Sequence, residues 1–244
     1  MKNKRIVLLI VVGVVLVLIA GIGVFTKVIK LNTLFTAKYD VKGVDVSHYQ
    51  GEISWDILAA EDLDFAYIKA TEGSSFVDER FVLNWEEASK TTLYTGAYHF
   101  FSFDSAGATQ ATHYIATVGE LSGRLLPVVD VEYYGDKWTN PPAKEAVVKE
   151  LQDMLSILEE EYGQKPMLYT TYEVYYKYLA EDFAEYPLWI RNVYFSPNVD
   201  MKGDWTIWQY SDTETLNGYQ GEEKYIDCNV FSGTEEELKQ LILE

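Results

Sequence analysis

The chain has 244 residues, of which 48% are apolar, 24% charged and 15% aromatic, and its 20 basic and 38 acidic residues give a formal net charge of −18. The aromatic content excludes a wholly disordered chain, and the acidic balance argues against nucleic-acid binding, which needs a basic face to neutralise phosphates. The single cysteine, Cys228, allows neither an intrachain disulfide nor a multi-cysteine metal site.

The first 38 residues form a basic, apolar leader. They hold six of the 20 basic residues and no acidic one, which leaves 14 basic against 38 acidic residues in 39–244, a net charge of −24. Ile6 to Phe25 is a run of 20 residues without a charged or strongly polar side chain. At about 1.5 Å per residue, such a helix spans about 30 Å, the thickness of the hydrocarbon core of a bilayer. Because a secretory signal peptide has a shorter apolar region of about 7–15 residues, we expect an uncleaved signal anchor over residues 6–25.

The charges that flank this run indicate its orientation only weakly, because basic residues stand on both sides. They are Lys2, Lys4, Arg5, Lys27 and Lys30. We expect residues 1–5 to be cytoplasmic, residues 26–40 to form a linker, and residues 41–244 to form one exported domain. An exported domain without disulfides is more typical of a bacterium than of a eukaryotic secretory pathway.

In the body of the chain, short strand-like runs alternate with helical patterns. Eight runs rich in β-branched or aromatic residues are predicted strands: 41–47, 65–71, 94–101, 125–132, 167–171, 188–192, 206–211 and 225–229. Helical patterns follow the first four strands, with a weaker one after the fifth and a last one near the C-terminus: 55–61, 78–90, 106–118, 143–162, 172–180 and 234–243. Beyond the fifth strand the gaps become short and lose clear helical patterning.

This alternation predicts an α/β fold with a parallel sheet and helices packed outside it. Eight strands in roughly 200 residues favour a closed, TIM-like barrel that is small for its type. A doubly wound open sheet is the alternative, but it would want a glycine-rich phosphate turn after the first strand. The segment 46–51, Val-Ser-His-Tyr-Gln-Gly, is no such turn.

Acidic residues stand at three of the predicted strand ends, where the chemistry of such a barrel is found. Asp45 is near the end of the first strand, Asp130 and Glu132 close the fourth, and Asp227 lies in the eighth. Asp130 and Glu132 are two residues apart and therefore point to one face of a strand. Close carboxyl groups raise one another's pKa, which gives the protonated acid beside an ionised partner that glycoside hydrolysis needs. A lone Asp-x-Glu usually begins a solvated loop, so the prediction rests on the three strand ends together.

Aromatic residues in or just past the strand ends are the second signal, because flat faces with polar tips suit sugar rings. They are Tyr98, Phe100, Phe101, Tyr133, Tyr134, Tyr169, Trp189, Trp208 and Tyr210. About half of them would simply fill the barrel and its helix interface. The histidines match no common ligand spacing, and neither a Gly-x-Ser-x-Gly elbow nor a phosphate loop occurs, so we expect no metal and no cofactor.

Eight segments, in order, resemble glycoside hydrolase family 25, the lysozymes of Chalaropsis type. They are GVDVSHYQG at 43–51, FAYIKATEG at 65–73, GAYHF at 96–100, PVVDVE at 127–132, KPMLYT at 165–170, LWI at 188–190, IWQYS at 207–211 and IDCN at 226–229. Each motif is modest, but eight in order are specific. The resemblance covers about residues 41–232.

The resemblance implies an irregular barrel of five β/α units followed by three strands, and an N-acetylmuramidase that cleaves the β-1,4 bond from N-acetylmuramic acid to N-acetylglucosamine in peptidoglycan. By motif match, Glu132 is the general acid, and Asp45, Asp130 and Asp227 are the other cleft acids. The same match gives a substrate-binding set: Lys69, Tyr98, His99, Tyr169, Trp189, Trp208 and Gln209. Within it, Tyr169 and Trp208 line the muramyl subsite, and Lys69 and His99 form the wall near the acids.

The resemblance also implies retention of anomeric configuration, through either an enzyme carboxylate or the 2-acetamido group of the substrate. The second route, which we favour by analogy with other acetamido-assisted hydrolases, has Asp130 orient the acetamide. Two other functions stay open: a related glycosidase acting on chitin-like glycans, and a non-catalytic peptidoglycan-binding scaffold of a wall-spanning complex. The presence of Glu132 favours an enzyme. A membrane anchor predicts local wall remodelling, with the barrel on the wall side of the membrane of a Gram-positive bacterium.

Overall fold

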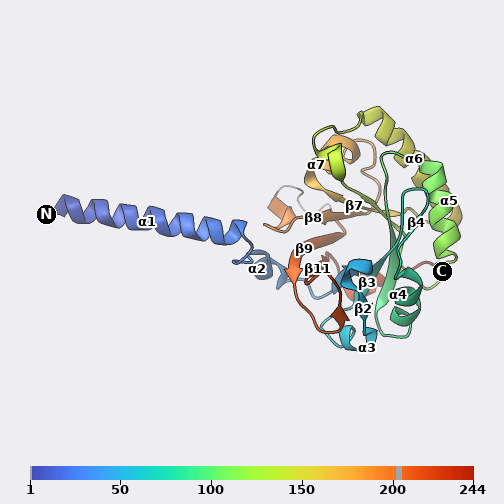
Figure 1. Cartoon of the computed structure of the whole chain (residues 1–244), viewed down its shortest axis with the longest axis horizontal. Helices are drawn as coiled ribbons and strands as arrows, with labels where there is room; N and C mark the ends of the chain where they lie inside the picture. The colour runs from blue at the N-terminus through green and yellow to red at the C-terminus, as the bar shows by residue number, and fades with distance from the viewer. Residues whose placement is uncertain (1, 200, 202–204) are drawn as a thin grey trace.

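The computed structural model describes residues 2–199, 201 and 205–244 and shows a long N-terminal helix that projects from a barrel (Figure 1). Helix α1 (Lys2–Phe25) contains the apolar run Ile6–Phe25, which has a mean hydropathy of 3.3 and no residue buried inside the structure. This run is long and apolar enough to cross a membrane, as an anchor or as a signal sequence. A short helix, α2 (Asn32–Thr36), follows it and lies between α1 and the barrel.

Eight strands form the barrel. Their bounds are β1 (Lys42–Val46), β3 (Phe65–Glu72), β5 (Tyr94–Phe100), β6 (Val128–Val131), β7 (Met167–Thr171), β8 (Leu188–Arg191), β9 (Ile207–Glu214) and β11 (Ile226–Phe231). The order around the barrel is β1-β11-β9-β8-β7-β6-β5-β3, and pairing of β1 with β3 closes it. All neighbours are parallel except β11, which runs antiparallel to both β9 and β1. The predicted closed barrel is confirmed, and each predicted strand has its counterpart.

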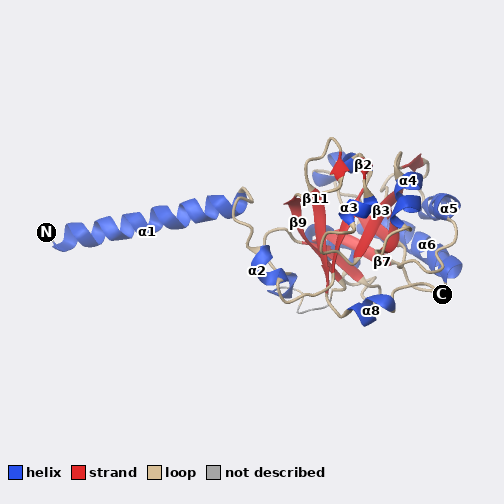
Figure 2. Cartoon of the chain, turned by 90° about the horizontal axis from the view of Figure 1, so that it is seen from below, coloured by secondary structure: helices blue, strands red, loops and turns tan. Residues whose placement is uncertain are grey.

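Helices follow the first five barrel strands along the chain and cover the outside of the barrel (Figure 2). They are α3 (Trp55–Leu58), α4 (Phe81–Ala88), α5 (Gly107–Val118), α6 (Lys144–Tyr162), and α7 (Tyr172–Val174), which continues into a π-helical turn at Tyr175–Leu179. The last helix, α8 (Glu235–Lys239), is shorter than the sequence pattern predicts. Three short strands were not predicted: β2 (Glu52–Ile53), β4 (Phe76–Val77) and β10 (Tyr219–Gln220).

Helix α6 shows how the sequence sets the outer layer. Its apolar residues at helical spacing are buried against the sheet and α5, as the periodicity predicts. The helix ends at Gly163, whose φ of 72° is the left-handed conformation that glycine adopts without strain. Helix α6 also lies very close to α5. A Cβ added at Gly107, the first residue of α5, would stand 1.7 Å from the carbonyl oxygen of Glu150 in α6. A glycine at position 107 therefore allows the two helices to touch.

The two ends of the barrel interior differ. Apolar side chains fill the end where the parallel strands begin, and Leu238 of α8 packs beneath them. This cluster includes Val41, Phe65, Tyr67, Leu125, Val128, Met167, Ile207 and Phe231. The ring of Tyr67 fits there because its neighbour is Gly96, where a Cβ would stand 2.2 Å from the ring. The opposite end, where the parallel strands finish, is open and polar.

Candidate active site

A cavity of about 380 Å³ opens at the carboxyl ends of the parallel strands. Its walls come from all eight strands of the barrel and from the loops beside their ends. The lining residues are Asp45, Val46, Ser47, Tyr49, Gln50, Lys69, Tyr98, Phe100, Val128, Asp130, Glu132, Tyr169, Trp189, Asp212, Glu223, Tyr225 and Asp227. All four predicted cleft acids therefore face one cavity, as expected if the strand ends meet at one face of the barrel.

Strand register brings the four acids together. Asp45 on β1 is paired directly with Asp227 on β11. Asp130 on β6 is paired with Phe100 on one side and Tyr169 on the other. Because β11 is antiparallel, Asp227 stands near the beginning of its own strand and yet at the end of β1. The antiparallel direction of β11 therefore places a residue from the start of this strand at the end of the barrel where the parallel strands finish.

Two amide side chains hold Asp45. Gln209 Nε2 and Asn229 Nδ2 both donate to Asp45 Oδ2, at 3.1 and 2.8 Å. The oxygens of these amides are already engaged, since Tyr169 OH donates to Gln209 Oε1 at 3.0 Å and Trp189 Nε1 donates to Asn229 Oδ1 at 2.9 Å. An indole N–H can only donate, so it fixes the Asn229 amide with its NH₂ group toward the acid. The network orients one carboxylate oxygen of Asp45 in a fixed position.

Burial dominates the protonation of the four acids. It raises the pKa of Asp45 to about 6, against the hydrogen bonds from Asn229 and Gln209, and it raises the pKa of Asp227 to about 8, with a further contribution from the charge of Asp45. Burial also raises the pKa of Glu132, and it raises that of Asp130 well above its usual range, where the neighbouring charge of Glu132 adds to the effect. The cavity therefore keeps some of its acids protonated near neutral pH.

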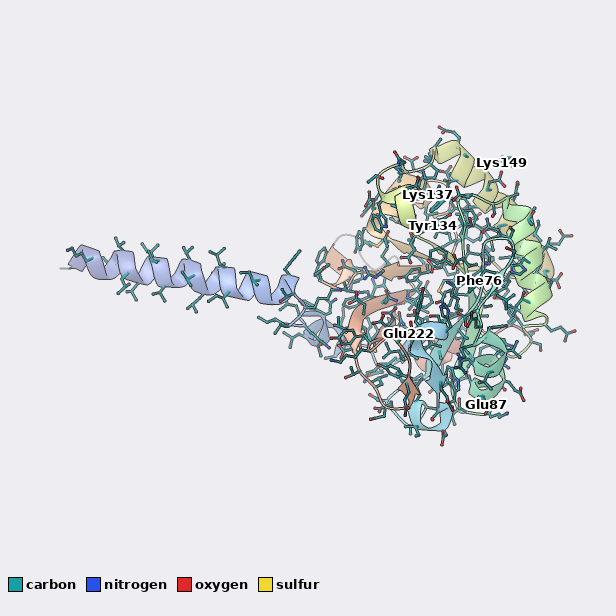
Figure 3. All side chains as sticks on the ribbon, in the orientation of Figure 1. Phe76, Glu87, Tyr134, Lys137, Lys149 and Glu222 are labelled. Carbon is teal, nitrogen blue, oxygen red and sulfur yellow. The ribbon has the colours of Figure 1, made fainter. Side chains whose placement is uncertain are left out.

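Lys69 lies at the wall beside Asp130. Its Nζ donates to Glu72 Oε2 at 2.7 Å and stands 4.9 Å from the ring centroid of Phe100 and 5.8 Å from that of Phe76. Phe76, labelled in Figure 3, comes from β4, the short strand that pairs with the end of β3. The positive charge of Lys69 lowers the pKa of Asp130, against the larger effect of burial.

The structure brings most of the predicted substrate-binding residues to the cavity, but not all of them. Lys69, Tyr98, Tyr169 and Trp189 line it, and Gln209 stands behind the wall as the donor to Asp45. His99 and Trp208 are absent from the lining.

The pleat of the strands explains both absences. His99 lies between Tyr98 and Phe100, which face the cavity, so its side chain points outward. It is fully buried there between Thr71 Oγ1 at 2.7 Å and Gln110 Oε1 at 3.0 Å, and burial lowers its pKa to about 4. The expectation that His99 forms the wall near the acids does not fit this position.

Trp208 is likewise the outward neighbour of Gln209 on β9. Its Nε1 donates to the carbonyl oxygen of Asn192 at 2.8 Å, and its ring packs against Trp205 and Tyr39 on the outside of the barrel. A place in the muramyl subsite does not fit this position either.

Several residues at the site were missed from the sequence. Asn229 and Arg191 could have been found, since each lies two residues beyond a predicted site residue on the same strand and so shares its face. The charge of Arg191 lowers the pKa of Asp45, Glu132 and Asp227. No local pattern pointed to Asp212, which lies on the extension of β9 beyond the barrel.

A closed barrel whose strand ends place one buried and three half-buried carboxyl groups around one cavity has the arrangement of a barrel glycoside hydrolase. The comparisons with known proteins specify which. The model of the family "Glycosyl hydrolases family 25" matches residues 44–219. The chain belongs to this family, and the resemblance seen in the sequence motifs is confirmed.

The solved structure of a family 25 glycosyl hydrolase from Bacillus anthracis is 48% identical, with a TM-score of 0.80, and covers 85% of this chain and 95% of its own. The protein YegX of Escherichia coli O157:H7 is 38% identical over 212 residues, covering 84% of this chain and 75% of YegX. Lysozyme M1 of Streptomyces globisporus is 30% identical over 217 residues, covering 82% of this chain and 71% of the lysozyme. The similarity therefore extends over the barrel in all three.

Proposed function

We propose that this chain is a lysozyme-like N-acetylmuramidase that hydrolyses the β-1,4 bond between N-acetylmuramic acid and N-acetylglucosamine in peptidoglycan. The observation that carries the proposal is the pair Asp130 and Glu132, two acids with raised pKa values that face the cavity of a family 25 barrel. The similarity to Lysozyme M1 supports the substrate class.

In this proposal Glu132 is the general acid. It lies one residue past the end of β6, and burial raises its pKa, so the side chain keeps a proton that it can give to the leaving oxygen. The bond between C1 of the muramyl ring and O4 of glucosamine breaks as the proton passes to O4. The resulting Glu132 carboxylate then takes a proton from the water that attacks C1 in the second step.

Asp130 is proposed to act on the 2-acetamido group of the muramyl ring. Its Oδ1 is buried and has no hydrogen-bond partner among the described residues, so it is free to accept the acetamide N–H. In its ionised state, which the charge of Lys69 favours, Asp130 would then stabilise the positive charge that develops when the acetamide oxygen bonds to C1 and forms an oxazolinium intermediate. Water opens this intermediate at C1, which gives net retention.

Asp45 is proposed to support the charge on the other side of the ring, while its neighbour Asp227, whose pKa is raised to about 8, stays protonated and leaves Asp45 as the ionised member of the pair. Asp45, fixed by Gln209 and Asn229, presents a second oxygen that the amides do not use, and an ionised carboxylate there would favour an oxocarbenium-like transition state. Tyr98, Tyr169 and Trp189 supply aromatic wall against which the sugar rings can lie.

We further propose that residues 6–25 remain as a single-pass anchor, with residues 1–5 in the cytoplasm and the barrel of residues 41–244 on the wall side of the membrane of a Gram-positive bacterium. The support for the anchor is the length and hydropathy of Ile6–Phe25. Such an anchor would keep the enzyme close to newly made glycan and restrict it to local remodelling.

Mass spectrometry of the fragments released from purified sacculi by the detergent-solubilised chain tests the activity. We expect muramic acid at the new reducing ends. Reducing-end glucosamine would contradict the proposal, and glycan binding without release would indicate a scaffold. Chemically de-N-acetylated sacculi form a second arm of the same experiment, in which the acetamido-assisted route predicts loss of cleavage and a carboxylate nucleophile predicts that cleavage is retained.

A further inference from the structure

The segment between the apolar helix and the barrel is docked on the barrel. We call residues 26–39 the docking segment. Lys27 Nζ contacts Asp212 Oδ1 at 2.7 Å and Oδ2 at 2.5 Å, and Lys30 Nζ contacts Glu214 Oε1 and the carbonyl oxygen of Thr213, both at 2.9 Å. Both lysines therefore pair with the extension of β9, more than 180 residues away in the sequence.

Further contacts hold the same segment. Asn32 is buried, and its Nδ2 donates to the carbonyl oxygens of Asn192 and Tyr210 at 2.9 and 2.8 Å. The ring of Tyr39 packs edge-on against Trp205, with 5.3 Å between centroids. Figure 2 shows α2 beside the barrel, on the side of β9. The docking segment is therefore held on the outer surface of the barrel at several points, although the sequence predicted only a linker there.

Lys27 has an unusual backbone. Its φ is 58°, and it is the one non-glycine residue with positive φ in the part of the chain that the structure describes. A long side chain adopts this left-handed conformation only where its surroundings determine it. Here the left-handed turn directly follows α1 and directs the ammonium group to Asp212.

Asp212 connects Lys27 to the cavity. It lines the cavity, and its Oδ2 also accepts from Arg191 Nη2 at 2.6 Å. The exposed fraction is 25% for the Lys27 side chain, 19% for Asp212 and 32% for Arg191, so solvent screens these charges only in part. Asp212 thus sits between a cation from the docking segment and a cation that acts on the cleft acids.

We propose that Lys27 is a positioning residue of the catalytic cleft, which holds Asp212 and, through it, the guanidinium of Arg191, whose charge acts on Glu132 and Asp227. This inference rests on the proposed muramidase function, and it does not require that residues 6–25 span a membrane. The docking segment is then a component of the enzyme as well as a connection.

The charged and titratable groups around Asp212 define what loss of Lys27 does. Lys27 faces Asp212 from the docking segment, Arg191 faces it from β8, and Asp227 interacts with it from β11. The ring centroid of Tyr194 lies 5.7 Å from Lys27 Nζ. Without Lys27, the negative charge of Asp212 is compensated by Arg191 alone. The cleft carboxyl groups then ionise less readily, and both limbs of the pH profile move toward higher pH.

The test measures kcat and KM from pH 4 to 9 with the full chain in detergent micelles and a soluble tetrasaccharide of alternating N-acetylglucosamine and N-acetylmuramic acid. Lys27→Ala is compared with Lys30→Ala, which removes the same charge from the same segment. Lys30 pairs with Glu214, a residue outside the cavity lining. Lys27→Arg keeps the charge, and thermal unfolding verifies that every variant is folded.

We expect Lys27→Ala to lower kcat/KM by about two- to fivefold and to move its pH profile upward by roughly half a unit. Lys27→Arg should restore both, Lys30→Ala should leave both unchanged, and 1 M salt should reduce the difference. Identical pH profiles for Lys27→Ala and Lys30→Ala, whether shifted or not, would overturn the inference. An inactive unmodified chain would instead overturn the proposed function, so the two failures are distinguishable.

Discussion

The same strands build both ends of the barrel interior, and the two ends do opposite things. At one end Phe65, Tyr67 and Met167 pack into an apolar plug that excludes water. At the other, Asp45, Asp130 and Asp227 surround a cavity. The first end lowers the free energy of the fold through burial, whereas the second places carboxyl groups where desolvation makes their charged forms costly. The barrel can tolerate the free-energy cost of these desolvated acids because its other half is apolar and closely packed and stabilises the fold.

The largest difference between the ends should be in turnover. We expect Glu132→Gln to reduce the rate of glycan cleavage by about 10² to 10⁴-fold, because the amide cannot donate a proton as an acid does. Thermal stability and glycan binding should stay near those of the unmodified chain, since a buried acid is replaced by a neutral group of the same shape.

Glu87→Gln is the matched control for that substitution. Glu87, labelled in Figure 3, lies on the outer helix α4. It pairs with Lys90 and is absent from the cavity lining, so its substitution makes the same chemical change away from the cavity. Release of reducing ends should be unaffected. Full activity of Glu132→Gln would remove the assignment of Glu132 as the general acid.

A truncation in the apolar plug should have the reverse effect. Met167→Ala removes a fully buried side chain from the plug and should lower the free energy of unfolding by about 2–5 kcal/mol. Urea unfolding followed by near-ultraviolet circular dichroism measures this, with the exposed Leu83→Ala as control. The activity of the molecules that remain folded should change little. A large loss of kcat with unchanged stability would mean that the plug end contributes directly to catalysis.

The smallest of these effects concerns the pH dependence of stability. The pKa of Asp227 is raised to about 8 in the folded chain from its usual value of 3.8. Its protonated form is thus favoured by folding, and the stability it contributes is fully present below the lower pKa and is lost as pH rises toward 8. We expect Asp227→Asn to raise the free energy of unfolding at pH 8 by about 1–2 kcal/mol relative to the unmodified chain, and to have little effect at pH 4. An equal change at both pH values would contradict a titration of Asp227.

Much of this architecture could be predicted from the sequence because the signals were local. Alternation of β-branched runs with helical patterns predicted the closed barrel. The place of an acid within a predicted strand then predicted which end of the barrel it occupies. The period of two also carried information that the family motifs did not. It separates Tyr98 from His99 and Gln209 from Trp208, and in each pair the structure places the second residue on the outer face.

What could not be predicted depends on contacts between distant segments. Lys27 and Asp212 are 185 residues apart in the sequence, and no local sequence pattern predicts their contact. Likewise, the pairing of β2 with β10 joins two runs of only two residues each. The network that holds Asp45 requires four side chains from four strands, so its geometry appears only when the barrel closes.

The antiparallel course of β11 has a practical consequence. After passing the cavity, the chain runs to the opposite end of the barrel, where α8 covers the plug and the backbone of Leu243 pairs with Gly123 and Arg124 ahead of β6. A fluorescent protein or affinity tag fused after Glu244 would therefore emerge on the side away from the cavity. Such a fusion should report where the enzyme resides in a growing cell while its access to glycan strands stays open.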